Sequence, residues 1–175
     1  MAARRIVTGI DADGRGIVTS DGPAEELVVQ SGGPLRIDDV WGADVQLRVP
    51  ADGSKPVYER FFPPSNGFRV MLVHLEPHGD TPIDLDAYVA ERERVLIGYS
   101  EDAIVDDVQP ELHATQTVDI ALVLEGEVTL RLDNDVDVTV TRGDYVVQNG
   151  TRHSWHNHSG VLCSLVVFVT GADRA

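Results

Sequence analysis

The chain has 175 residues and a mass of 19.0 kDa, the size of one ordinary domain with a single core. Hydrophobic residues make up 42% of it and charged residues 25%, with a mean hydropathy of -0.09, which excludes collagen-like, coiled-coil and disordered classes. The 29 acidic and 14 basic residues give a net charge of -15. Such a negative surface repels phosphate backbones and anionic lipid, so we expect no nucleic-acid or membrane partner.

Nothing in the sequence predicts secretion or membrane insertion. The first residues lead directly into a strand-like run without a long apolar segment. The longest near-continuous apolar stretch, 161–169, is far shorter than the roughly 20 residues that cross a bilayer. The single cysteine, Cys163, has no partner for an internal disulfide, and we expect a buried, inert thiol. A cytoplasmic protein is the simplest expectation.

The first half of the chain predicts short strands, one long loop and one helix. Residues 5–10 and 17–19 are strand-like and flank an Asp-Gly pair that favours a hairpin turn. Residues 50–67 contain four prolines and two glycines and predict a loop. Residues 68–75 predict a strand.

A helix is predicted over residues 82–98. Thr81 is placed to cap it, Pro82 suits its first position, and Asp84 follows where a carboxylate satisfies free amides. Gly98 marks its end. We expect this helix either to cover the mouth of a barrel as a lid or simply to pack against the outer sheet.

From residue 112 onward the pattern is dense β. Residues 127–132 and 135–141 alternate polar and apolar side chains and predict a hairpin with one face on the core. Residues 118–124 are apolar on both faces apart from Asp119, so this strand needs cover on both sides. The N-terminal strands, the helix or a second subunit would supply the outer cover. Many short strands with one helix indicate an all-β barrel or sandwich.

Two polar clusters interrupt this apolar pattern. On one face of a strand through residues 113–119 lie His113, Thr115, Thr117 and Asp119. Burying such groups unpaired costs on the order of a few kcal/mol each, whereas a solvent-facing strand requires nothing of them. In the second cluster a strand enters an Asn-Gly turn and leaves as another strand, whose alternate faces carry His153, Trp155 and Asn157, and Ser154, His156 and His158.

These clusters resemble the two motifs of the cupins, G-x5-H-x-H-x3,4-E-x6-G and G-x5-P-x-G-x2-H-x3-N. The run HATQTVDIALVLEG matches the first motif from His113, with Asp119 at the glutamate position and Gly126 at the closing glycine. The second motif matches through Gly143, Gly150, His153 and Asn157, with one residue fewer between the glycines and Gln148 in the proline position. The match spans 113–157, about a quarter of the chain, and is closest to small single-domain Cupin_2-like barrels with a degenerate H-x-T-x3-D first motif.

The resemblance implies an all-β, cupin-type double-stranded β-helix (jelly-roll barrel) with N-terminal strands and one short helix. We expect a single domain over 1–175, with N-terminal strands and loop in 1–67, a strand plus helical insertion in 68–112, and the barrel motifs in 113–170. A homodimer is expected, because 118–124 is apolar on both faces and cupins commonly pair through their sheets.

The resemblance also implies that His113, Asp119 and His153 point into the barrel as metal ligands and catalytic residues. Two imidazoles and one carboxylate are typical of mononuclear iron sites, and zinc, manganese or nickel are alternatives. The chain departs from the family at Thr115, which replaces a ligating histidine, and at Asp119, which is one methylene shorter than glutamate. Thr115, Thr117, Gln148 and Trp155 are the predicted substrate-binding residues, and Gln148 is also a weak candidate oxygen ligand.

Two functions from different classes are therefore predicted. One is a metal-dependent enzyme of the oxygenase, decarboxylase, isomerase or cyclase type, acting on a small oxygen-bearing organic substrate. The other is a barrel that has lost its metal and serves as a ligand-binding or sensing module, or as a metal-free isomerase or cyclase with a His–Asp base. His74 and His78 are expected to be structural, and His156 and His158 to lie at the surface or an interface.

Overall fold

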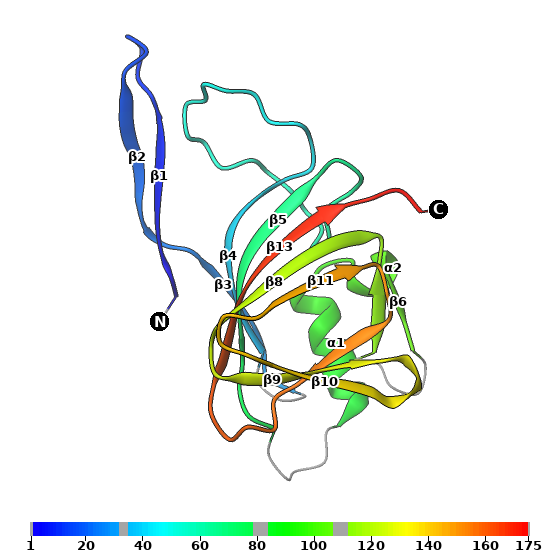
Figure 1. The fold of residues 1–175 in the computed structure, drawn as a ribbon. Helices are drawn as coiled ribbons and strands as arrows, with labels where there is room; N and C mark the ends of the chain where they lie inside the picture. The colour runs from blue at the N-terminus through cyan, green and yellow to red at the C-terminus, as the bar shows by residue number, and fades with distance from the viewer. Residues whose placement is uncertain (1, 32–34, 79–83, 107–111, 175) are drawn as a thin grey trace.

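The computed structural model describes residues 2–31, 35–78, 84–106 and 112–174, in which two antiparallel sheets face one another around a core (Figure 1). The six-stranded sheet has the order β11-β8-β13-β5-β4-β3, and the five-stranded sheet the order β10-β9-β12-β7-β6. This architecture confirms the predicted all-β jelly roll.

The elements of the six-stranded sheet are β3 (Glu25–Val29), β4 (Leu35–Ala43), β5 (Phe68–Leu75), β8 (Thr117–Glu125), β11 (Tyr145–Asn149) and β13 (Cys163–Gly171). Those of the five-stranded sheet are β6 (Ala103–Val105), β7 (His113–Thr115), β9 (Glu127–Leu132), β10 (Val136–Thr141) and β12 (His153–His156). The helical elements are α1 (Leu85–Val95), α2 (Tyr99–Asp102) and the 3-10 turn η1 (Asp133–Asp135), and β1 (Arg4–Ile10) and β2 (Gly16–Pro23) form a separate hairpin.

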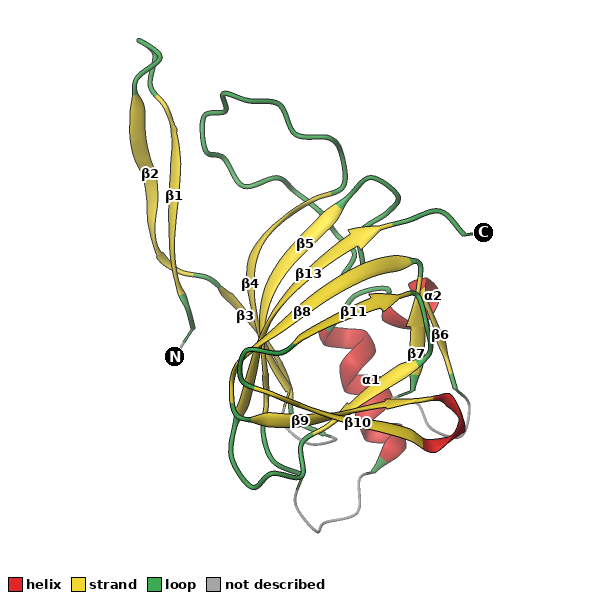
Figure 2. Ribbon diagram, viewed as in Figure 1, coloured by secondary structure: helices red, strands yellow, loops and turns green. Residues whose placement is uncertain are grey.

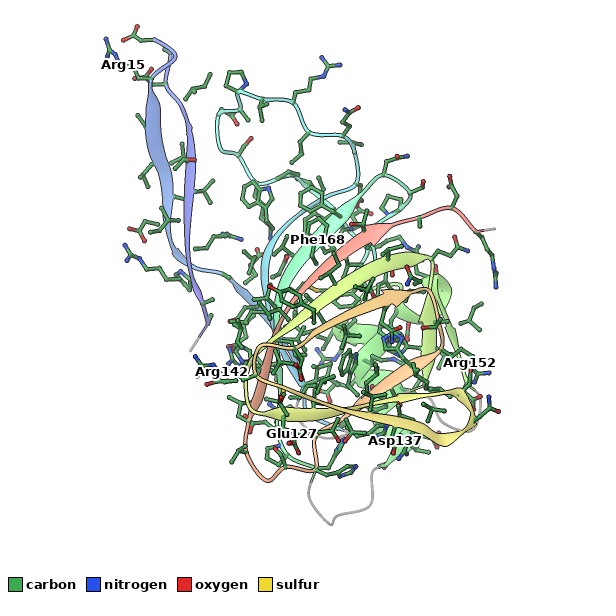
Figure 3. All side chains as sticks on the ribbon, in the orientation of Figure 1. Arg15, Glu127, Asp137, Arg142, Arg152 and Phe168 are labelled. Carbon is green, nitrogen blue, oxygen red and sulfur yellow. The ribbon has the colours of Figure 1, made fainter. Side chains whose placement is uncertain are left out.

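The N-terminal hairpin confirms the predicted turn. Gly14 has a φ of 77°, and the Asp11 carboxylate accepts hydrogen bonds from the amides of Asp13 and Arg15 at 2.9 and 2.8 Å. The hairpin stands away from the barrel, with Arg15 at its tip (Figure 3). Residues 50–67 form no helix or strand, as predicted.

Helix α1 is shorter than the predicted 82–98. Its N-cap is Asp84, whose carboxylate accepts from the amide of Ala87 at 3.1 Å, while the predicted cap Thr81 lies outside the described residues. The helix ends before Gly98, which has a φ of 77° and begins the short α2. The left-handed conformation of this glycine interrupts the helical run and separates the two helices. None of the described helices is long and apolar enough to cross a membrane.

The core consists of two clusters between the sheets. One joins the inner face of the six-stranded sheet to the helices and contains the buried residues Val29, Ile37, Phe62, Met71, Leu96, Tyr99, Ala103 and Val169. The other joins the two sheets and contains Ala121, Val123, Val128, Val140, Cys163 and Leu165. The cysteine is completely buried, as predicted.

The expected cover on both faces of β8 is present on one face only. Ala121 and Val123 are buried against the core, whereas Ile120 and Leu124 are each 42% exposed on the outer face. Neither the N-terminal hairpin nor α1 supplies the outer cover within the chain, because the hairpin pairs only with itself and α1 packs on the inner side.

Candidate functional site

A cavity of about 960 Å³ lies between the two sheets and is bounded by α1. Its walls are mainly apolar and include Ile37, Met71, Val73, Ala121, Leu165 and Val167. A volume of this size and an apolar lining with a few polar groups are typical of sites for small organic ligands.

Strand register brings four of the predicted site residues into this cavity. Gln148 of β11 is paired directly with Asp119 of β8, and His153 of β12 is paired with His113 of β7. All four line the cavity. The two motifs therefore meet through antiparallel strand pairing.

Counted along the sequence, His113 and His153 lie 40 residues apart, and only the strand pairing makes them neighbours.

The two histidines form a close pair. Their ring centroids lie 4.5 Å apart, with the ring planes tilted by 45°. The Nδ1 atom of His153 is 2.9 Å from the carbonyl oxygen of Thr151, and because a carbonyl only accepts, Nδ1 carries the hydrogen. Burial lowers the pKa of His153. A neutral ring in this tautomer keeps its lone pair on Nε2.

The carboxyl group of Asp119 has one buried oxygen atom that makes no hydrogen bond to the described residues. That atom, Oδ1, is enclosed by protein. Burial raises the pKa of Asp119 to about 6, and a hydrogen bond from the Thr117 side chain acts in the opposite direction. A carboxyl with such a pKa exchanges its proton near neutral pH, as an acid–base group requires.

The predicted substrate-binding residues separate into two groups. Gln148 and Trp155 line the cavity, but Thr115 and Thr117 do not. The two threonines are buried, and their hydroxyl oxygens lie 2.6 Å apart. The chain passes from one sheet to the other at Gln116, between β7 and β8, so residues 113–119 do not form the single strand on which the shared-face argument relied.

The residues present do not fit the three-ligand metal site that the motif implies. Within the described part of the chain, no three His, Cys, Asp or Glu side chains are arranged to hold one metal ion. His113 and His153 are neighbours, and Asp119 lines the same cavity without completing a set with them. The threonine in place of a histidine and the shorter acidic side chain account for the incomplete set.

Three further histidines line the cavity. The ring centroids of His78, His156 and His158 lie 5.4 to 5.9 Å from one another. His158 is exposed, as expected of a surface residue, whereas His78 and His156 are half-buried where they line the cavity. The spacing of His156 and His158 was visible in the sequence, but the approach of His78 depends on a backbone hydrogen bond to Asn157 at 2.7 Å.

The other motif residues have structural roles. The buried Asn157 donates to the carbonyl oxygens of Leu75 and Val161, each at 2.7 Å, and so fastens the end of β5 to the turn before β13. His74 lies in a separate buried network, 2.9 Å from Ser164 and 3.4 Å from Asp38. That position is consistent with the structural role predicted for His74.

Residues of helix α1, which is drawn in red in Figure 2, form part of the cavity wall. Leu85, Ala87 and Tyr88 line the cavity, and the Glu91 carboxylate accepts from the backbone amides of residues 30 and 31 at 2.9 and 2.8 Å. The helix packs on the inner side of the six-stranded sheet. A lid movement stays a prediction.

Residues 105–169 match the sequence profile of the cupin domain (Cupin_2). The chain therefore contains a cupin domain. Phomopsin biosynthesis cluster protein C' of Diaporthe leptostromiformis is 42% identical over 59 residues, which cover 34% of this cupin and 31% of that protein. Oryzines biosynthesis cluster protein J of Aspergillus oryzae is 43% identical over 61 residues, covering 35% and 34%. The match thus spans about a third of the length of these curated relatives.

Solved cupin structures are similar over most of the chain at low sequence identity. The cupin domain of Schizosaccharomyces pombe Cnp3 has a TM-score of 0.46 and 8% identity, covering 98% of this chain and 89% of that one. A putative ethanolamine utilization protein Q from Salmonella typhimurium has a TM-score of 0.45 and 11% identity, covering 99% of each chain.

Proposed function

We propose that this cupin binds a small organic molecule in its cavity and catalyses acid–base chemistry on it without a metal. His153 serves as the base and Asp119 as its acidic partner. The observation that carries the proposal is the placement, in one apolar-walled cavity, of a neutral imidazole and a carboxyl whose Oδ1 has no partner among the described residues. Homodimerisation through the exposed face of β8 is part of the proposal and does not affect the chemistry.

The environments of the two groups favour opposite roles. His153 is held neutral by burial, and its hydrogen bond to the Thr151 carbonyl leaves Nε2 able to accept a proton. Asp119 has a pKa raised to about 6 by burial, so a substantial fraction is protonated in mildly acidic solution. When the surroundings shift the pKa values of two groups in opposite directions, one group can accept a proton from the substrate while the other donates one. Isomerisation and ring closure require such a transfer.

Two relatives support a substrate of small-molecule metabolism. Both are named as proteins of biosynthesis clusters, and each matches this cupin over about a third of its length. We therefore propose an intermediate of such a biosynthesis as the ligand class. The apolar cavity walls favour a molecule with a hydrophobic body and a small polar group.

The test is proton exchange at carbon in bound ligands. Candidate small molecules that bind the purified protein are incubated with it in D₂O, and deuterium incorporation is measured by mass spectrometry. We expect catalysed incorporation that falls by about 10² or more in His153→Ala, the usual contribution of a general base. His74→Gln is the matched control, because His74 lies in a network outside the cavity lining. Equal incorporation with His153→Ala would contradict the acid–base role.

A metal-dependent enzyme is the second candidate. The adjacent imidazoles of His113 and His153 support it, since the Nε2 of a neutral His153 is available for ligation. The test is elemental analysis of protein purified without chelators and then reconstituted with iron, zinc, manganese or nickel. Stoichiometric metal that is absent from the double variant His113→Ala, His153→Ala would establish this candidate over the metal-free one.

A further inference from the structure

Two residues that line the cavity each carry a buried polar atom that has no hydrogen-bond partner within the described ranges. These atoms are Oδ1 of Asp119 and Nε2 of Gln148, whose residues are directly paired on β8 and β11. Gln148 is only 5% exposed, and both side chains line the cavity. A buried polar atom without a hydrogen-bond partner lowers the stability of the fold, and a bound ligand that supplies the partner removes this cost.

The orientation of the Gln148 amide follows from its one hydrogen bond. The Thr151 hydroxyl donates to Oε1 of Gln148 at 2.6 Å, which satisfies the amide oxygen and leaves Nε2 as an unused donor. The neighbouring Asp119 Oδ1 is an unused acceptor when the carboxyl is ionised. Two directly paired residues of the barrel therefore carry one unused donor and one unused acceptor.

We propose that Gln148 and Asp119 bind an uncharged carboxamide or lactam group of the ligand. Gln148 Nε2 donates to the carbonyl oxygen of that group, and its N–H donates to Asp119 Oδ1. Both protein atoms lie beneath the cavity surface, so they meet the ligand after a rotation of their side chains. This inference rests on the proposed ligand-binding function and names the class of ligand.

The surroundings of the pair favour this class over a carboxylate. A carboxylate ligand would place a second acidic group against the Asp119 carboxyl, and it offers no N–H to the unpartnered Oδ1. Five Phe, Tyr and Trp side chains line the cavity: Phe61, Phe62, Tyr88, Tyr99 and Trp155. They suit a planar body attached to the amide.

The experiment compares three probes of one shape: benzamide, N,N-dimethylbenzamide, which lacks the N–H, and benzoate. Dissociation constants are measured at pH 8 by ligand-observed NMR titration. We expect benzamide to bind about tenfold or more tightly than either other probe, the effect of one or two hydrogen bonds. Gln148→Leu and Asp119→Leu should remove this preference, whereas Asp119→Asn retains an acceptor oxygen and part of it.

Gln116→Leu is the matched control, because Gln116 is exposed and lies outside the cavity lining. Circular dichroism of each variant verifies folding before the titration. Equal binding of the three probes, or an unchanged preference in Gln148→Leu, would overturn the amide pair and leave the ligand-binding function standing. Binding of no probe at millimolar concentration would overturn both.

Discussion

The buried Asp119 carboxyl makes the stability of the fold depend on pH in an unusual direction. Its pKa is raised from 3.8 to about 6 by burial, so the folded protein binds this proton more tightly than the unfolded chain. The folded state therefore gains stability from protonated Asp119 in acid and loses that contribution as pH rises from about 4 to about 6. A pKa difference of roughly two corresponds to about 3 kcal/mol, which is an upper value for this partly buried group.

Asp119→Asn removes the ionisation while keeping the shape of the side chain. At pH 7 the variant should be more stable than the original protein by up to about 3 kcal/mol, and the difference should disappear near pH 4. The assay is urea unfolding of both proteins between pH 4 and 8 in the presence of EDTA. Other carboxyls titrate alike in the two proteins and cancel in the difference.

Asp137→Asn is the matched control, because Arg131 holds the pKa of the exposed Asp137 below its usual value. The expected change in stability has the opposite sign to that of Asp119→Asn. The Asp137→Asn variant should be less stable than the original protein above the unfolded pKa, and this loss should diminish in acid. A stability difference for Asp119→Asn that does not vary with pH would refute the reasoning. So would a variant that is less stable than the original protein at pH 7.

The remaining predictions concern stability and association. Gly126→Ala should destabilise the fold by more than about 2 kcal/mol in urea unfolding, since Gly126 has a φ of 76° and a Cβ there would lie 2.3 Å from a backbone carbonyl oxygen. Gly143→Ala, with a φ of 93° and no atom within 4 Å, should lose less. Ile120→Lys on the exposed face of β8 should convert a dimer to a monomer in analytical ultracentrifugation, and Ile104→Lys on the other sheet should not; a wild-type monomer would contradict the dimer. Asp84→Ala should cost about 1 kcal/mol through loss of the α1 cap, and an unchanged thermal midpoint would contradict that role.

The two candidate functions predict opposite effects of Asp119→Asn on stability when metal is present. In the metal-free proposal its Oδ1 atom has no partner among the described residues, and replacement of Asp119 by asparagine relieves the cost of burying a charge. A bound metal would make the same replacement destabilising in the loaded protein, because it would remove a ligand. Unfolding measurements with and without added metal therefore separate the two candidates independently of any substrate.

The sequence alone determined the fold class and the local elements of this protein. Alternating side chains in 127–132 and 136–141, the Asp-Gly turn and the prolines of 50–67 act over a few residues, and the structure contains the strands and the loop that they predict. The motif spacing also identified His113 and His153 as residues that meet. Local periodicity and spacing are properties of the chain itself, so they are visible before folding.

Tertiary structure decided the composition of the site. Thr115 and Thr117 do not line the cavity as predicted, because the chain passes from one sheet to the other at Gln116. The alternation of side chains in the sequence does not reveal this change of sheet. His78 lines the cavity because its backbone amide donates to Asn157, which is distant in the sequence. The Oδ1 atom of Asp119 lacks a partner because none of the described residues around it places a donor within reach. Burial and missing partners are properties of all the packed elements together, and only the folded barrel defines them.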